Sequence, residues 1–280
     1  MAGKTVLITG GSAGIGASTA TSLAELGAQV VVSCRDIEKA RRYFASHSPA
    51  ANIDILPLEL GSFSSIRAFV AQVLSRYAKV DVLINNAGLL PVEYSLTEDG
   101  YESTFGINFL GHFLLTELLM DRLIASAPAR IIHVSSAVHN RATPDMEAFF
   151  SPSKEQEKNF SWMKHYSQSK LANILYSNWL AERLRGTGVT SNALHPGMVN
   201  TEIIRGFPCW MAWGWKWVSK TPQQGAQTSV YLASNEELCE LSGLYFVNSK
   251  PAKTARCAED TSLALALCQR SLVEVGLLGA

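Results

Sequence analysis

The sequence predicts an α/β fold of the doubly wound Rossmann type, in which helices cover both faces of a parallel sheet of about seven strands. Short apolar runs alternate along the chain with longer amphipathic segments, a pattern typical of repeated βαβ units. The runs are apolar throughout rather than at every second residue, as in strands that are buried on both faces. A glycine-rich turn follows the first run, where such folds bend from strand to helix.

The short apolar runs place the expected strands at residues 5–9, 29–34, 53–58, 82–85, 130–135, 189–194 and 244–247. The amphipathic segments between them place helices at 15–26, 37–46, 63–77, 101–125, 166–185 and 223–232. The chain ends in further apolar helical stretches at 263–267 and 272–278, which we expect to pack on the sheet or on a partner.

Length and charge narrow the class of protein. With 280 residues, 47% of them hydrophobic, the chain can bury one large core, so we expect a single domain over residues 1–280. Basic and acidic residues number 24 each, which gives no overall field to attract nucleic acid or an anionic membrane. The five cysteines have no paired spacing, no secretory signal is visible and no run of apolar residues is long enough to span a bilayer. These features favour a cytoplasmic protein with free thiols.

The first strand leads into the sequence TGGSAGIG at residues 9–16, which opens a helix. Glycines allow a sharp turn and a close approach of the backbone to a ligand, and the helix amino terminus attracts negative charge. The turn therefore predicts a site for a dinucleotide pyrophosphate. The spacing G-x-x-x-G-x-G differs from the common G-x-G-x-x-G fingerprint, but its place between strand and helix is the required one.

Tyr166 and Lys170 stand one helical turn apart in the run YSQSK. The pKa of a free tyrosine is about 10, and a neighbouring cation lowers it, so this pair can serve acid-base catalysis near neutral pH. The alternative is a packed ring beside a solvated lysine.

Taken together, TGGSAGIG, NNAG at residues 85–88 and YSQSK resemble the short-chain dehydrogenase/reductase family in order and spacing across nearly the whole chain. The segments 34–36, 108–116 and 169–173 are most similar to its retinol dehydrogenase-like branch. The resemblance implies hydride transfer between a nicotinamide cofactor and an alcohol or carbonyl group. It implies a catalytic set of Asn108, Ser136, Tyr166 and Lys170.

Within that set, Tyr166 would exchange the proton of the substrate oxygen, and Ser136 would donate a hydrogen bond to that oxygen. The resemblance selects Ser136 over Ser135, since the family uses the second serine of the pair. It also implies that Lys170 holds the nicotinamide ribose and that Asn108 holds a water that links the lysine to solvent. The alternative for Asn108 is an amide that kinks or caps a helix.

The cofactor residues that follow from these motifs are Gly10, Ser12, Gly14, Ile15, Gly16, Arg35, Glu59, Leu60, Asn85, Ala87, Gly88, Tyr166, Lys170, Pro196, Gly197, Val199 and Thr201.

The end of the second strand bears on the choice of cofactor. Cys34 occupies the place of the acidic residue that binds the ribose of NAD, and Arg35 can pair with a 2′-phosphate, so NADP(H) is favoured over NAD(H). The alternatives are that Arg35 caps the following helix or pairs with Asp36 or Glu38. The family usually has Asp-Leu after the third strand, where this chain has Glu59-Leu60, which leaves the hydrogen bond to adenine open.

The irregular stretches 137–164 and 202–220 are long for connections and are expected to face the substrate. The tryptophan-rich segment 207–217 makes 202–220 a candidate lid over a lipophilic retinoid, steroid or other carbonyl compound. The same segment could contact a bilayer interface, pack internally or form a homodimer contact.

No metal-ligand spacing and no hydrolase elbow are present. His139 and His165 flank the predicted site and could line the substrate pocket. Besides an enzyme, the fold would suit an NADP(H)-binding regulatory protein with little turnover.

Overall fold

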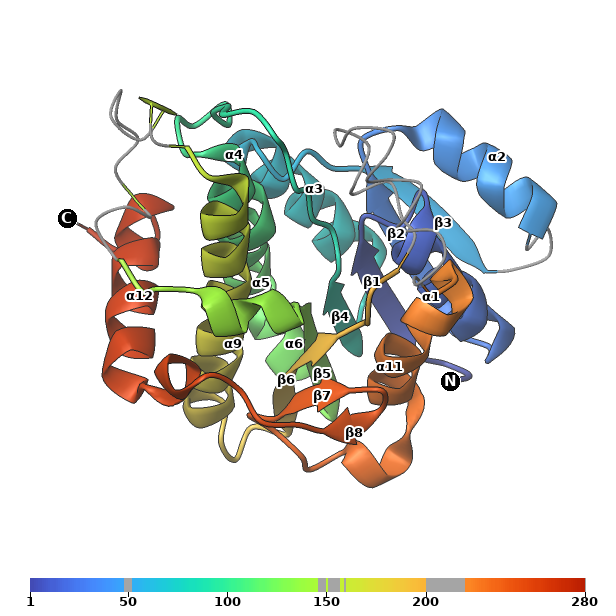
Figure 1. Ribbon diagram of the computed structural model, residues 1–280. Coiled ribbons are helices and arrows are strands. Elements are labelled where there is room, and N and C mark those ends of the chain that lie inside the picture. The colour runs from blue at the N-terminus through green and yellow to red at the C-terminus, as the bar shows by residue number, and fades with distance from the viewer. Residues whose placement is uncertain (48–51, 146–149, 151–156, 159, 200–219, 280) are drawn as a thin grey trace.

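The computed structural model describes residues 1–47, 52–145, 150, 157–158, 160–199 and 220–279. Its strands form one eight-stranded sheet, seen between two layers of helices (Figure 1). Across the sheet the strands run in the order β3 (Ile53–Pro57), β2 (Gln29–Cys34), β1 (Thr5–Thr9), β4 (Val82–Asn85), β5 (Ala129–Val134), β6 (Val189–His195), β7 (Tyr245–Val247) and β8 (Lys250–Pro251).

The pairs from β3 to β7 are parallel, which confirms the doubly wound fold. The eighth strand, β8, pairs antiparallel with β7 and was not predicted from the sequence. Asn248 and Ser249 form the turn between them with φ angles of 51° and 59°. A run of only two residues, one of them Pro251, carries no apolar pattern from which a strand could be predicted.

Two layers of helices bury the sheet. Helices α1 (Gly14–Glu25), α2 (Ile37–His47) and α11 (Pro222–Ser234) cover one face, and α3 (Phe63–Arg76), α5 (Gly111–Leu118) and α9 (Trp162–Arg183) cover the other (Figure 1). Successive strand residues point to opposite faces of the sheet. Leu7 packs in the core under α3, α5 and α9, while Val6 and Ile8 pack in the core under α1, α2 and α11. Because both faces are buried, the strands contain continuous apolar runs.

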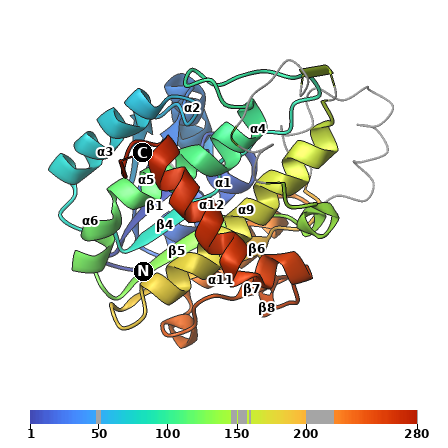
Figure 2. The ribbon, with the colours of Figure 1, turned by 90° about the vertical axis from the view of Figure 1, so that its left-hand side faces the viewer.

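The carboxyl-terminal helix α12 (Thr261–Glu274) lies against α9, as the view in Figure 2 shows. Leu267 and Cys268 of this helix are fully buried in the core. The tail therefore packs on a helix of the same chain rather than directly on the sheet.

The prediction of one helix over residues 101–125 is wrong. The segment is divided into α4 (Ser103–Phe105), a π-helical turn η1 (Gly106–Leu110), α5 and α6 (Met120–Ala125). Gly111 packs so closely on Leu60 that an added Cβ would lie 2.4 Å from its carbonyl oxygen. The apolar pattern continues through all of residues 101–125, so the sequence does not show where the extra residue of the π turn interrupts the helix.

The predicted lid over 202–220 lies, except for its last residue, outside the described residues, as does Thr201. The residues on either side of the gap meet, because the Lys220 N–H donates to the Met198 carbonyl over 2.7 Å and Val199 forms a bridge with Lys220. In the described part of the chain, no helix has both the length and the apolar character needed to cross a membrane.

Candidate active site

A cavity of about 840 Å³ opens at the carboxyl ends of the central strands, where ligands bind in open α/β sheets. It is lined by most of the predicted site residues. The exceptions are Asn85 and Asn108, whose side chains do not line it, and Thr201, which lies outside the described residues. The sequence motifs, far apart along the chain, are thus brought to one cavity.

The glycine turn after β1 forms a tight cradle at one end of this cavity. Gly10 has a φ of 69°, and a Cβ there would lie 2.8 Å from the Ala87 Cα. A Cβ on Gly16 would lie 2.4 Å from the Gly10 carbonyl oxygen. Side chains are therefore excluded between the turn and the NNAG segment, and helix α1 begins here with its positive end. This cradle suits a pyrophosphate.

Helix α9 carries Tyr166 and Lys170 in its first turns. The helix begins at Trp162, earlier than predicted, because the Ser161 side chain caps it by accepting a hydrogen bond from the Lys164 N–H. Tyr166 and Lys170 both line the cavity, and so do Trp162 and Met163, which the early start adds to the helix.

Two neighbouring serines at the end of β5 have different partners. The Ser136 hydroxyl accepts from the Val138 N–H over 3.4 Å and lies close enough to the Tyr166 phenol to lower its pKa through a hydrogen bond. Ser135 is buried and donates to the Lys170 main-chain carbonyl over 2.6 Å. Ser136 is thus the serine placed to share a substrate oxygen with Tyr166.

Burial shifts the pKa values of both Tyr166 and Lys170. Burial raises the pKa of Tyr166 to about 12, and the hydrogen bond with Ser136 opposes the shift. This direction is opposite to the sequence expectation that Lys170 would lower the tyrosine pKa. The Lys170 ammonium lies over the Tyr166 ring, with Nζ 5.5 Å from the ring centroid, and burial lowers its own pKa to about 8. A buried lysine that readily loses its charge stabilises a neighbouring phenolate less than a charged lysine would.

Lys170 is 3% exposed and donates from Nζ to the Val134 carbonyl over 2.9 Å. Gly88 lies against it, since an added Cβ there would be 3.4 Å from Nζ. The ammonium is therefore held between the end of β5 and the NNAG segment.

Asn108 lies in the π turn η1 and is fully buried. Its amide oxygen accepts from the Leu89 N–H, and its amide nitrogen donates to the Leu89 carbonyl and to Ser169 Oγ. Ser169 in turn donates to the Tyr166 carbonyl. The Asn108 side chain thus ties the loop after β4 to helix α9, a structural role that is compatible with the expected relay.

The NNAG segment uses its two asparagines differently. Asn85 is buried and donates to Thr116 Oγ1 over 2.9 Å, away from the cavity. Asn86, which the sequence analysis did not select, lines the cavity and donates from its side chain to the Thr9 carbonyl over 2.7 Å. Side chains of adjacent residues in an extended segment point to opposite sides, and only tertiary contacts decide which side faces the ligand.

At the other end of the cavity, Arg35 is exposed and its Nη1 lies 3.7 Å from Glu59 Oε2. The alternative partners are engaged elsewhere: Asp36 accepts from the Lys39 N–H, and Glu38 pairs with Arg41. Lys39, a second cation missed by the sequence analysis, also lines this end. Arg35 and Lys39 together form a basic edge at this end of the cavity. The sequence feature that could have revealed Lys39 is its place in the first turn of the helix that follows Arg35.

Apolar side chains make up much of the remaining cavity wall, together with the charged Arg141. The apolar residues are Leu89, Leu90, Val138, Trp162, Met163 and Met198, of which Trp162 and Met163 precede Tyr166 on the same helix. None was predicted individually, although Leu89 and Leu90 directly follow the NNAG motif. His139 and His165 do not line the cavity, whereas His195 does, and burial lowers the pKa of His195 to about 4.

Comparison with known proteins agrees with this geometry. The family model described as short chain dehydrogenase matches residues 4–210. The chain belongs to this family. It is 43% identical to retinol dehydrogenase 14 of Homo sapiens over 301 aligned residues, covering 99% of this chain and 88% of that protein. The retinol dehydrogenase-like branch expected from the sequence is thereby confirmed.

Comparison with solved structures also finds proteins of similar fold. This short-chain dehydrogenase is similar to a putative uncharacterized protein from Mycobacterium Paratuberculosis, with a TM-score of 0.78 and 32% identity over 98% of this chain and 94% of that one. It is also similar to the Pseudomonas aeruginosa RhlG/NADP active-site complex, with a TM-score of 0.69 and 26% identity over 88% and 94% of the two chains. The protein is an oxidoreductase of a family that uses nicotinamide cofactors.

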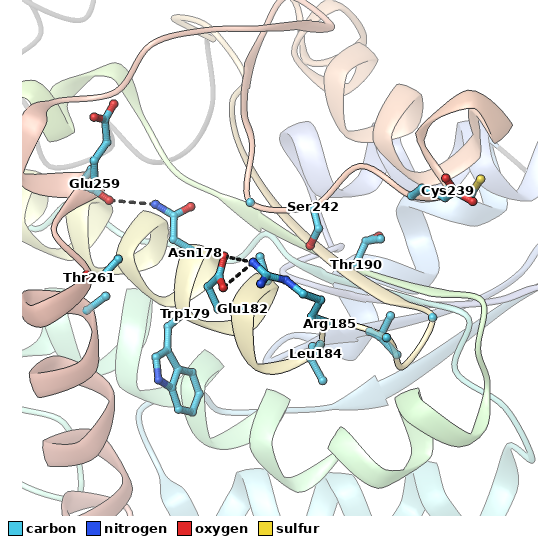
Figure 3. A pocket seen from close by; sticks show the side chains of 18 of the residues that line it. Asn178, Trp179, Glu182, Leu184, Arg185, Thr190, Cys239, Ser242, Glu259 and Thr261 are labelled. Atoms are coloured by element: carbon cyan, nitrogen blue, oxygen red, sulfur yellow. Dashed lines mark hydrogen bonds and ion pairs between the residues drawn. The ribbon is translucent and has the colours of Figure 1, made fainter.

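The short-chain dehydrogenase has a second cavity of about 730 Å³ at the opposite end of β6 (Figure 3). Asn178 donates there to the Ala258 carbonyl, and Glu182 pairs with Arg185 over 2.6 Å. None of the predicted catalytic or cofactor residues lines it. The first cavity is therefore the candidate active site.

Proposed function

We propose that the protein is an NADP(H)-dependent dehydrogenase or carbonyl reductase that acts on a lipophilic alcohol or carbonyl compound, with Tyr166 as the acid-base catalyst. The observation that carries the proposal is that Ser136, Tyr166 and Lys170 line the same cavity as the glycine cradle, with Ser136 close enough to lower the pKa of the Tyr166 phenol. A phosphate-binding end and a proton-transfer end are the two parts that such an enzyme needs.

In reduction, the substrate oxygen would accept hydrogen bonds from Ser136 and Tyr166, and Tyr166 would give it a proton. In oxidation, the phenolate would take that proton back. When bound, the nicotinamide supplies or accepts the hydride at the substrate carbon. Lys170, which lies beside both Tyr166 and Gly88, would hold the ribose at reacting distance.

The choice of NADP(H) is supported by the basic edge at Arg35 and Lys39, where a 2′-phosphate would lie. Without a ligand, Glu59 is the ion-pair partner of Arg35, and its other oxygen accepts from the Gly61 N–H over 2.9 Å. Phosphate binding would replace a long, exposed ion pair, which is worth little.

The proposal of a lipophilic substrate is supported by the apolar residues of the cavity wall, among them Trp162 and Met163 just before Tyr166, and by the name of the relative, retinol dehydrogenase 14. A retinoid-like aldehyde or alcohol agrees with both the apolar wall and the name of the relative. Steroids and other lipophilic carbonyl compounds agree with the apolar wall alone.

The test is a turnover assay on purified protein with NADPH and a panel of retinals, ketosteroids and aromatic aldehydes, followed by the loss of NADPH absorbance. We expect turnover on at least one lipophilic carbonyl, and slower turnover when NADH replaces NADPH. A small polar aldehyde is added to the panel as a control, and turnover confined to it would contradict the proposed substrate class.

A regulatory NADP(H)-binding protein with little turnover is the second candidate. It would need the glycine cradle and the basic edge but not the contact between Ser136 and Tyr166. Tight NADPH binding without turnover on any member of the panel would favour it.

A further inference from the structure

His139 has no assigned role in the proposed reaction, yet it makes direct contact with the backbone of Ser136. It is fully buried in the short 3-10 helix η2 (Ala137–Arg141), which follows Ser136. Its ring Nδ1 lies 2.7 Å from the Ser136 carbonyl oxygen, and its own main-chain N–H donates to the same oxygen over 3.1 Å. Both acceptor positions of that carbonyl are therefore occupied by one residue.

The other ring nitrogen fixes which tautomer is present. The main-chain N–H of Ala255 points at His139 Nε2 over 3.2 Å. An amide N–H can only donate, so Nε2 is the acceptor and the proton is on Nδ1, which donates to Ser136. Burial lowers the pKa of His139, in agreement with a neutral ring. The Tyr245 ring packs edge-on against it at 5.0 Å.

Ala255 lies outside the part of the chain that the family model matches. It belongs to the segment between β8 and α12, beyond residue 210, where the family model ends. Ala255 starts the 3-10 helix η5 (Arg256–Glu259), and Asn178 of α9 donates to the Ala258 carbonyl of that helix. The segment is thus anchored on α9, the helix that carries Tyr166, and contacts the Ser136 backbone through one imidazole ring.

We propose that His139 is a positioning residue for Ser136, and that through Ala255 it makes the geometry of the Ser136 and Tyr166 pair depend on the segment between β8 and α12. The inference rests on the proposed function for its catalytic consequence. The rotation of the Ser136 backbone sets where its hydroxyl points, and small misplacements of a catalytic group are costly.

The tautomer can be tested without any turnover. Long-range ¹H–¹⁵N correlation spectra of ¹⁵N-histidine protein, with His139 assigned by comparison with the His139→Gln variant, should show a neutral ring protonated at Nδ1. A ring protonated at Nε2 would overturn the inference even in a fully active enzyme. Because this measurement needs no substrate, it separates a failure of the positioning role from a failure of the proposed function.

Ala255→Pro removes the N–H and leaves the imidazole in place. Ala255 has a φ of −61°, which proline also adopts, so the fold should tolerate the change. We expect kcat to fall about 10-fold while the Kd for NADPH stays within about twofold of wild type. Ala255→Ser, which alters the same residue but keeps its N–H, should exceed Ala255→Pro in kcat by about 10-fold.

Two substitutions of the ring separate its two contacts. In His139→Asn the amide nitrogen can replace Nδ1 as donor to Ser136, and in His139→Gln the amide oxygen can replace Nε2 as acceptor for Ala255. If the ring positions Ser136, Asn should retain more of kcat than Gln. Wild-type kcat in Ala255→Pro, or an equal loss of kcat and NADPH affinity in all variants, would show that these contacts are merely structural.

Discussion

The hydroxyl of Ser135 and the main-chain carbonyl of Lys170 are joined by a 2.6 Å hydrogen bond inside the protein. This bond ties the end of β5 to helix α9 at the level of Lys170. It also decides the roles of two adjacent serines, since Ser135 is committed to the fold while Ser136 is left to contact Tyr166.

The two serines should therefore respond differently to substitution by alanine. Ser136→Ala should lower kcat by about 100-fold, because it removes a donor to the substrate oxygen, and should lower the free energy of unfolding less than Ser135→Ala because its own bond from the Val138 N–H is long, at 3.4 Å. Ser135→Ala should lower the free energy of unfolding by about 1 kcal/mol through loss of a buried hydrogen bond, with a smaller effect on kcat. Steady-state kinetics and urea denaturation of both variants provide the measurement. The reverse pattern would mean that the catalytic serine is misassigned.

Tyr166→Phe removes the proton donor and keeps the ring. We expect kcat to fall by about 10² to 10⁴, the usual contribution of general acid-base catalysis. The Kd for NADPH, measured by fluorescence titration, should change little because the cradle at Gly10 and Gly16 is untouched. Wild-type turnover in this variant would overturn the mechanism.

Arg35→Ala should weaken NADPH binding and leave NADH binding almost unchanged. Loss of a charged hydrogen bond costs about 1.5–3 kcal/mol, so the preference for NADPH should fall about 10- to 100-fold. The matched control is Arg41→Ala, which removes another exposed arginine, paired with Glu38 and absent from the cavity wall. Equal kcat/KM ratios for the two cofactors in wild type and Arg35→Ala would refute the assignment.

The shifted pKa of Lys170 predicts a dependence of stability on pH. Its pKa is about 8 in the folded protein and 10.5 for an ordinary lysine, so the unfolded chain binds more protons between these values. The free energy of unfolding should rise with pH across this window, by at most roughly 3 kcal/mol, and the gain should be lost as the pH falls through 8.

Urea denaturation of wild type and Lys170→Met between pH 8 and 10.5 isolates this contribution, because the other groups titrate in both proteins. Lys164→Met, which removes an exposed lysine from the same helix, is the control and should follow wild type. A constant difference between wild type and Lys170→Met over this window would contradict the shift.

Much of the fold was predictable from the sequence. The bounds of β1, β2 and β4 agree with the prediction because a strand buried on both faces is a continuous apolar run with polar or glycine residues at its ends. The π turn at Asn108 and the short strand β8 were not predictable, since neither changes the apolar pattern of its surroundings.

By itself the sequence determined the doubly wound fold, the glycine cradle and the presence of Ser136, Tyr166 and Lys170, because local spacing and short motifs encode them. Only the tertiary structure decided which of Asn85 and Asn86 faces the cavity and that burial raises the pKa of Tyr166. It alone brought Ala255 to His139. Side-chain direction, desolvation and contacts between distant segments depend on how the whole chain packs, and a local pattern carries no information about them.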